Sequence, residues 1–450
     1  MPELAIVSRL LASLKPNPGN ARTHSPKQVG QIAASIRAFG FNNPVLVDSE
    51  DTIIAGHGRV EAARLLGMEC VPTLRLEHLT DAQKRAYIIA DNRLAELAGW
   101  DDEILAIELQ HLLEVDIDFE ITDIGFETAE IDLMLSDQAQ VAGEPDPADD
   151  VSQVESGPSV AALGDLWLLG PHRLYCGDAL SEVSYLTLMD GEKAQMAFTD
   201  PPYNVPIAGH VSGLGKAKHA EFAMASGEMS EAQFTRFLTG ALRQLAAASM
   251  DGSIHFVCMD WRHLLELMRA GRIAYSELKN LCVWAKDNGG MGSLYRSQHE
   301  LVAVFKSGAA PHINNIELGK HGRYRTNVWS YPGLSGFQAG RDEKLAMHPT
   351  VKPVGLVADA ILDCSKRHGI ILDPFAGSGT TLIAAQRTGR RCFAMELDPS
   401  FVDVALRRFR HVTGIEPVCA ATDKPLSAYE GQLAEPETRP CSHPSIEVGI

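Results

Sequence analysis

The sequence predicts an α/β protein in which an open, mostly parallel sheet flanked by helices follows a smaller α+β domain. Three observations predict this fold class. Short apolar runs alternate with helical periodicity between residues 161 and 418. A glycine turn at 375–379 separates a buried run from an apolar helix. An acidic stretch at 137–160 separates this half from residues 1–136, which have their own alternation of strands and helices.

Within residues 1–136, Ser25 and Pro26 are typical of a helix start, and Gly67 is typical of a helix end. The predicted elements are a helix at 27–39, strands at 44–48 and 52–55, a helix at 59–66, a strand at 70–76 and a largely helical run at 81–135.

Two segments lack any periodic apolar pattern. Residues 137–160 are acidic and contain Ser, Gly and Pro, so we expect a flexible linker. Residues 419–450 are rich in Pro, Ser and Glu, so we expect a disordered tail.

The region between these segments should form one domain, 161–418. Its predicted helices span 230–250, 263–272, 354–367 and 380–388, and its predicted strands span 253–259, 278–285, 301–305, 369–372 and 391–395. Asp200 and Gly377 then lie at the carboxyl ends of neighbouring strands, the usual ligand crevice of such a sheet.

Asp200-Pro201-Pro202-Tyr203 follows the apolar run 194–199. Methylation of an exocyclic amine requires acceptors for its two hydrogens, which the Asp200 carboxylate and the Pro201 carbonyl would supply. The two prolines fix the turn, so that both acceptors converge on one point. Tyr203 offers a flat face for a base flipped out of a duplex. The motif therefore indicates methyl transfer to a nucleic-acid base, by in-line displacement that depends mostly on positioning.

The turn Asp373-Pro374-Phe375-Ala376-Gly377-Ser378-Gly379 lacks the full dinucleotide fingerprint and the phosphate-loop lysine. The next strand ends in Glu396, where a carboxylate can accept from both hydroxyls of a ribose. A ribose without phosphates beside a glycine turn suits S-adenosylmethionine.

These motifs resemble those of the amino-group DNA methyltransferases, which act on adenine N6 or cytosine N4, and their order resembles the permuted beta-like subgroup. The resemblance implies a Rossmann-like sheet, double-stranded DNA as substrate and S-adenosylmethionine as cofactor. It implies catalytic roles for Asp200, Pro201, Pro202 and Tyr203. It also implies cofactor contacts from Asp178 (adenine amine), Thr350 and Lys352 (methionine carboxylate), and from Asp373, Phe375, Gly377, Gly379 and Glu396.

Charge is distributed unevenly along the chain. Residues 1–160 hold 11 Lys and Arg against 28 Asp and Glu, whereas residues 262–352 hold 13 basic against 7 acidic side chains. Basic side chains neutralise phosphates. By position, the basic stretch matches the family's target-recognition region, about 262–347, and we expect Lys320, Arg323 and Arg325 to face DNA.

Residues 1–136 resemble the ParB/sulfiredoxin-like domain through 20–22 and 56–63. His57 and Gly58 replace a Glu and an Arg of the partition-protein motif, which puts nucleotide binding in doubt. Arg22 and Arg59 could still hold a phosphate or a DNA backbone, because amides and arginines at a helix start bind anions. The sequence does not identify the ligand or partner of this domain.

Several classes of protein are disfavoured. The eight cysteines form no Cys-x-x-Cys pair, and the histidines show no metal-ligand spacing, so we expect no metal site. Methylation at cytosine carbon would need a cysteine after a proline, and the one such step, Pro440-Cys441, lies near the C-terminus. No apolar run reaches membrane-spanning length, which favours a cytoplasmic protein.

Asp at position 200 favours adenine, because many cytosine-N4 enzymes have Ser there. The alternatives are cytosine-N4 methylation, RNA or protein-glutamine methylation, and a non-enzymatic ParB-like DNA or nucleotide switch. A restriction-modification role and a homodimer also fit the family, and the recognition sequence is not predictable.

Overall fold

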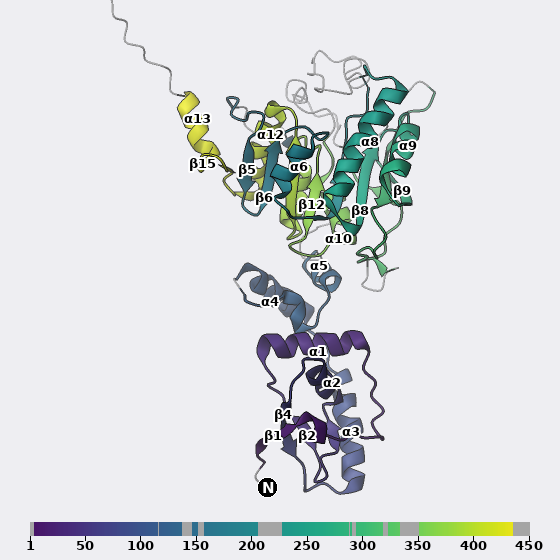
Figure 1. Cartoon of the computed structure of the whole chain (residues 1–450), viewed down its shortest axis with the longest axis vertical. Helices are drawn as coiled ribbons and strands as arrows, with labels where there is room; N and C mark the ends of the chain where they lie inside the picture. The colour runs from purple at the N-terminus through teal and green to yellow at the C-terminus, as the bar shows by residue number, and fades with distance from the viewer. Residues whose placement is uncertain are drawn as a thin grey trace, which may run out of the picture. The chain divides into compact units, whose positions relative to one another are not determined.

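The structure is a computed structural model. It describes residues 4–115, 117–136, 146–151, 157–205, 227–287, 289, 294–317, 323–333 and 351–434. The chain forms two compact units, Met1–Gln140 and Val141–Ile450, which are considered separately (Figure 1).

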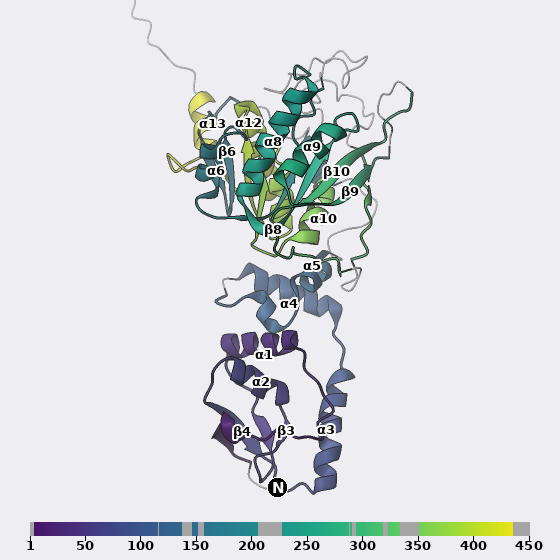
Figure 2. The same ribbon diagram turned by 45° about the vertical axis from the view of Figure 1, so that its right-hand side comes forward.

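The N-terminal unit contains a four-stranded sheet in the order β1-β4-β2-β3. β4 pairs antiparallel with β1 and parallel with β2, while β2 and β3 pair antiparallel. Val60 of α2 packs on one face of the sheet and Ile88 of α3 on the other, while α1 lies against α2 (Figure 2). The bounds are β1 Ile6–Leu10, α1 Pro26–Phe39, β2 Val45–Val47, β3 Ile53–Ala55, α2 His57–Leu65, β4 Cys70–Arg75 and α3 Asp81–Glu96, with a 3-10 turn at Leu11–Ser13.

Local sequence signals predict the positions of these helices and strands closely. Ser25 accepts a hydrogen bond from the Gln28 amide, as expected of the residue before a helix. The predicted run at 81–135 is broken into α3, α4 (Asp102–Glu114), a 3-10 turn (Ile121–Ile124) and α5 (Thr128–Ser136). α4 and α5 form a separate apolar cluster around Leu109 and Ile131.

The C-terminal unit is built on an eleven-stranded sheet in the order β11-β9-β10-β8-β7-β12-β13-β6-β5-β14-β15. Its central strands β8, β7, β12, β13 and β6 run parallel. The strands are β5 Leu166–Leu169, β6 His172–Cys176, β7 Ala194–Thr199, β8 Ser249–Met259, β9 Glu277–Ala285, β10 His299–Lys306, β11 Val328–Ser330, β12 Ile370–Asp373, β13 Arg391–Glu396, β14 Val418–Cys419 and β15 Lys424–Pro425.

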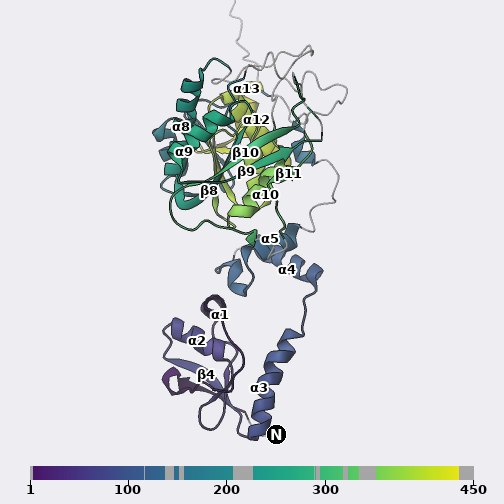
Figure 3. The same cartoon turned by 90° about the vertical axis from the view of Figure 1, so that its right-hand side faces the viewer.

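Helices cover both faces of this sheet, as predicted. Leu188 of α6, Phe234 of α8 and Leu267 of α9 share one apolar cluster. α10, α11 and α12 pack on the opposite face in a second cluster, and Figure 3 shows α8 and α9 on the other side of the strands from α10. The bounds are α6 Glu182–Met189, α8 Glu231–Ala247, α9 Leu264–Ala274, α10 Val354–Cys364, α11 Thr380–Arg387, α12 Pro399–Thr413 and α13 Leu426–Ala434.

The expected disordered tail is wrong for its first part. Residues 418–434 form β14, β15 and α13, in which Leu426 is fully buried and the Tyr429 ring meets the Trp167 ring edge-on at 5.6 Å. Glu430 also accepts from Arg407 at 2.7 Å and from Arg410 at 2.9 Å. These short elements are stabilised by distant partners, which local periodicity does not register. Residues 435–450 lie outside the described part.

The expected linker is also only partly correct. Residues 137–145 and 152–156 lie outside the described part, but Pro147–Asp149 forms a 3-10 turn and Ala148 is buried in the main core. The acidic side chains here have partners, since Asp146 pairs with Arg387 and Asp149 accepts from the Val354 amide. These contacts hold residues 146–149 in a defined conformation, although burial and Asp146 both raise the pKa of Asp149.

Candidate active site

Four acidic residues lie at one edge of the sheet because each follows or ends one of four adjacent parallel strands. Asp200 follows β7, Asp373 ends β12 and Glu396 ends β13. Asp178 lies two residues after β6, and the preceding Gly177 amide donates to the Glu396 carbonyl at 2.9 Å. The expected placement of Asp200 and Gly377 at neighbouring strand ends is thus confirmed.

The glycine turn between β12 and α11 needs residues without a side chain. Gly377 and Gly379 have φ angles of 51° and 81°, and a Cβ on Gly379 would lie 3.1 Å from Ala405. The buried Asp373 carboxylate accepts from Thr381 Oγ1 at 2.6 Å, Thr199 Oγ1 at 2.9 Å and the Phe375 amide at 3.1 Å. Asp373 therefore stabilises the conformation of the turn through these three hydrogen bonds.

Glu396 lies directly against this turn. Its carboxylate accepts from the Gly377 amide at 2.9 Å and from the Asp398 amide at 3.0 Å. Burial raises the pKa of Glu396 to about 7, although these backbone hydrogen bonds oppose the shift. Burial likewise raises the pKa of Asp373 to about 6. Two carboxyl groups with raised pKa values thus flank the turn.

The remaining expected cofactor contacts lie nearby. Asp178 is half-buried, and its Oδ1 accepts from the Leu180 amide at 2.9 Å. The Phe375 ring is 6.0 Å, centroid to centroid, from the ring of Phe237 on α8. Thr350 lies outside the described residues.

A cluster of charged side chains surrounds Asp200. Asp200 Oδ1 accepts from the Tyr203 hydroxyl and Oδ2 from Lys352 Nζ, both at 2.5 Å. Pro201 is buried and Pro202 half-buried, so the turn that carries these groups is enclosed. Lys352, an expected cofactor contact, donates here to Asp200 and, at 3.2 Å, to the Tyr203 hydroxyl oxygen.

Sequence reasoning missed two members of this cluster. Glu300 at the start of β10 contacts Lys352 Nζ at 3.0 Å and Lys286 Nζ at 2.5 Å. The Tyr203 hydroxyl also donates to Glu300, at 3.2 Å. The one signal in the sequence is a charged residue at the start of the apolar run 301–305, and it does not identify a partner.

The charges in this cluster are strongly coupled. Burial by itself lowers the pKa of Lys352, but the Asp200 and Glu300 carboxylates raise it above its usual range. Burial favours protonated Glu300, but Lys352 and Lys286 lower its pKa to about 2. Burial raises the pKa of Asp200, against the pull of Lys352. Glu300 therefore keeps its negative charge and holds Lys352 charged beside Asp200.

The expected DNA-facing arginines are corrected by the structure. Arg323 donates to Asp363 at 2.7 Å, and Arg325 donates to Asp359 at 2.7 Å and to Asp363 at 3.1 Å. The Arg323 side chain is 7% exposed. These guanidinium groups fasten the segment before β11 to α10, since a buried arginine needs a carboxylate partner. Lys320 lies outside the described residues.

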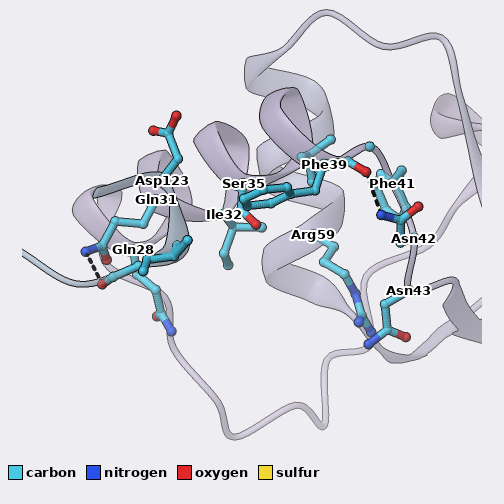
Figure 4. A pocket seen from close by; sticks show the side chains of 14 residues that line it. Gln28, Gln31, Ile32, Ser35, Phe39, Phe41, Asn42, Asn43, Arg59 and Asp123 are labelled. Carbon is cyan, nitrogen blue, oxygen red and sulfur yellow. Dashed lines mark hydrogen bonds between the residues drawn. The ribbon is translucent and has the colours of Figure 1, made fainter. Parts of the chain in front are cut away.

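In the N-terminal unit, a cavity of about 480 Å³ lies beside Arg59 (Figure 4). Burial lowers the pKa of Arg59, and its Nε has no hydrogen-bond partner within the part of the chain that the structure describes. The Arg22 guanidinium instead donates to Glu96 at 2.5 Å, and Arg22 does not line the cavity. The cavity is lined by Gln28, Gln31, Ile32, Ser35, Ile36, Phe39, Gly40, Phe41, Asn42, Asn43, Arg59, Asp123, Ile124 and Gly125.

Two features are absent from the described residues. None of their helices is long and apolar enough to cross a membrane. Over the same residues, no group of three or more His, Cys, Asp or Glu side chains is arranged to hold a metal ion.

Comparison with known proteins gives matches along most of the chain. A DNA methylase family model of the N6/N4 class matches residues 194–407. A ParB N-terminal domain model matches residues 5–93, and a ParB-methyltransferase HTH domain model matches residues 103–163. The HTH match includes α4 and α5, which periodicity alone predicted only as a helical run.

Individual proteins are similar to parts of this chain. The ParB-like nuclease domain-containing protein YnaK of Escherichia coli K12 is 54% identical over 83 residues, which are 18% of this chain and 95% of that protein. The Type II methyltransferase M2.MboI of Moraxella bovis is 24% identical over 52% of this chain and 86% of its own length. The crystal structure of the M1.HpyAVI–SAM complex aligns with 19% identity and a TM-score of 0.39, covering 52% of this chain and 97% of that one. The chain carries a DNA methylase domain of the N6/N4 class at residues 194–407, preceded by an N-terminal ParB-like domain at residues 5–93.

Proposed function

We propose that the chain transfers a methyl group from S-adenosylmethionine to the exocyclic amine of a base flipped out of double-stranded DNA. The single observation that carries this proposal is the position of Asp200 and the glycine turn at the carboxyl ends of the neighbouring parallel strands β7 and β12. This arrangement brings the acceptor for the target amine to the same edge as the candidate cofactor turn.

The residues of the cofactor site fit S-adenosylmethionine. The left-handed backbone of Gly377 and Gly379, which carry no side chain, and the Glu396 carboxylate suit a ribose without phosphates. When bound, the cofactor supplies a methyl group on a positively charged sulfur. Glu396 would accept from the ribose hydroxyls and Asp178 from the adenine amine, while Phe375 would pack against the cofactor.

Asp200 and its neighbours would orient the target amine. The Asp200 carboxylate and the Pro201 carbonyl accept its two hydrogens, which leaves the nitrogen lone pair directed at the methyl group. Both Asp200 oxygens already accept one hydrogen bond, but each carboxylate oxygen has a second lone pair. Tyr203 would stack on the flipped base. Once the new carbon–nitrogen bond has formed, the amine would pass its extra proton to the Asp200 carboxylate, which already accepts a hydrogen bond from it.

The preferred target is adenine N6, and the second candidate is cytosine N4. Asp at position 200 supports adenine, whereas the family match covers both bases. Mass spectrometry of nucleosides from methylated DNA separates the two products. N6-methyladenine is expected, and N4-methylcytosine alone would overturn the preference.

Asp200→Ala tests the catalytic assignment. It should abolish methyl transfer to DNA in a radiometric assay, because the main acceptor for the amine is lost. Its affinity for S-adenosylmethionine, measured by calorimetry, should stay near that of the wild type, because Asp200 is not proposed to touch the cofactor. Retained methylation would contradict the assignment.

For the N-terminal domain, we infer that Arg59, rather than Arg22, is the residue available to an anionic ligand. Its buried Nε and the adjoining cavity support this choice. Calorimetric titration with inorganic pyrophosphate should detect binding that Arg59→Gln removes and Arg22→Gln retains. Equal loss in both variants, or no binding to the wild type, would exclude this role.

A further inference from the structure

The acidic segment 146–149 makes contacts that extend to the proposed cofactor site. Asp146 at its start forms two hydrogen bonds with the Arg387 guanidinium at the end of α11, one of them at 2.9 Å. Ala148 is 3% exposed and belongs to the same apolar cluster as α10, α11 and α12. The segment is thus built into the C-terminal unit.

One guanidinium group joins this segment to the glycine turn. Arg408 of α12 is 1% exposed. Its Nη2 donates to the Ala148 carbonyl at 2.9 Å. Its Nη1 donates to the Ser378 hydroxyl at 2.8 Å, to the Ser378 carbonyl at 3.1 Å and to Thr380 Oγ1 at 3.0 Å. Ser378 lies between the two glycines of the turn. Arg408 therefore holds both the glycine turn and the segment 146–149.

Burial lowers the pKa of Arg408 to about 10, although Asp149 and Asp146 oppose this shift. A charge so far from water is stabilised only if its donors find acceptors. The Ala148 carbonyl and the turn supply those acceptors. Arginine's planar fork can serve several fixed acceptors together, which lysine's single ammonium group cannot do in the same geometry.

The same segment also holds the start of α10. Asp149 Oδ1 accepts from the Val354 amide at 2.8 Å. Pro353, the residue that precedes α10, has no side-chain acceptor for this amide, so Asp149 caps the helix from a distant part of the sequence. Val354 is two residues from Lys352, whose ammonium group contacts Asp200.

We propose that residues 146–149 form part of the cofactor site, with Arg408 and Asp149 as positioning residues. Arg408 holds the glycine turn in its cofactor-binding shape, and Asp149 holds the helix start that follows Lys352. This inference rests on the proposed function, because it assigns a purpose to the turn only if S-adenosylmethionine binds there.

The test uses full-length Arg408→Gln with Arg407→Gln as its matched control. Arg407 lies beside it on α12 and is also buried, but it donates to Glu430 and to the Pro158 carbonyl, not to the turn. Arg408→Gln should raise the dissociation constant for S-adenosylmethionine by about tenfold, with kcat at saturating cofactor close to that of the wild type. Arg407→Gln should lower the unfolding midpoint without changing cofactor affinity.

Two outcomes would overturn the inference: wild-type affinity in Arg408→Gln, or equal weakening in both variants. If Arg408→Gln does not fold, Asp149→Ala decides, because it removes the side-chain acceptor of the Val354 amide. A raised KM for the cofactor supports the inference, and an unchanged KM rejects it. Failure of the wild type to bind S-adenosylmethionine would instead reject the proposed function itself.

Discussion

At the scale of single residues, the Glu396 carboxyl combines burial with two backbone hydrogen bonds at the glycine turn. Its pKa of about 7 means that it is largely protonated below that pH in the cofactor-free protein. A proton on the carboxyl removes an acceptor that the ribose hydroxyls need.

Affinity for S-adenosylmethionine should therefore fall as the pH is lowered from about 8 to about 6, by up to about tenfold per pH unit below the pKa. Calorimetry across this range measures the effect. Glu396→Gln should bind more weakly and lose most of the pH dependence. A wild-type affinity that does not vary with pH would contradict the ribose role.

Glu300 offers a second prediction at this scale, because it keeps Lys352 charged and next to Asp200. Glu300→Gln leaves two ammonium groups without their shared counter-charge. We expect kcat to fall by about tenfold or more, the consequence of losing at least 1.4 kcal/mol of transition-state stabilisation. Glu277→Gln, at an exposed pair with Lys279, is the control and should retain wild-type kcat. Unchanged kcat in Glu300→Gln would show that the cluster does not support catalysis.

How far the site could be predicted depends on where its residues lie in the chain. Asp200, Gly377 and Glu396 each follow a short apolar run, and parallel strands bring such positions to one edge. Glu300 instead lies on β10, and Lys286 directly follows β9. The register of these two antiparallel strands cannot be predicted from either segment alone. Their meeting with Lys352 requires the folded sheet.

At the scale of elements, the segment before β11 is fastened to α10 by buried ion pairs. Arg323 and Arg325 share Asp363, whose side chain is 4% exposed. A count of charged residues along the sequence cannot detect such pairs. It therefore led to the prediction that both arginines face DNA. Burial and the partner on a distant helix decide their role.

Asp363→Asn should destabilise the chain by roughly 3–5 kcal/mol, because the two arginines lose their buried counter-charge and keep only Asp359, whose side chain is 33% exposed. Urea unfolding measures the loss. The exposed pair between Lys279 and Glu277 gives the comparison, and Glu277→Gln should change stability by less than about 1 kcal/mol. A loss in Asp363→Asn no larger than in this control would show that the pairs are solvent-screened.

Elements with strong local signals were predicted closely, and those that depend on tertiary contacts were not. The helix capped by Ser25 begins at Pro26, one residue before the predicted start. The turn Pro147–Asp149 and the helix Leu426–Ala434 escaped prediction because their stability comes from Arg408, Arg407 and Trp167 far away in the sequence. Composition alone made both segments resemble disordered chain.

At the scale of the whole molecule, the two units have separate apolar cores, and the proposed cofactor residues all belong to the second unit. We therefore expect calorimetric unfolding in two transitions, of which S-adenosylmethionine raises one. At a free concentration of about 100 times the dissociation constant, the stabilisation should be about 2.7 kcal/mol. Glu396→Ala serves as the control and should weaken the shift. Equal shifts of both transitions would contradict the separation of the units.

The most direct test of the central claim is modification-sensitive sequencing of genomic DNA from cells that express the wild type or Asp200→Ala. The account predicts methylated adenine at a short sequence motif with the wild type and none with the variant. The same mark in both samples, or no methylated base in either although the wild type is folded and binds S-adenosylmethionine, would contradict DNA amine methylation through Asp200.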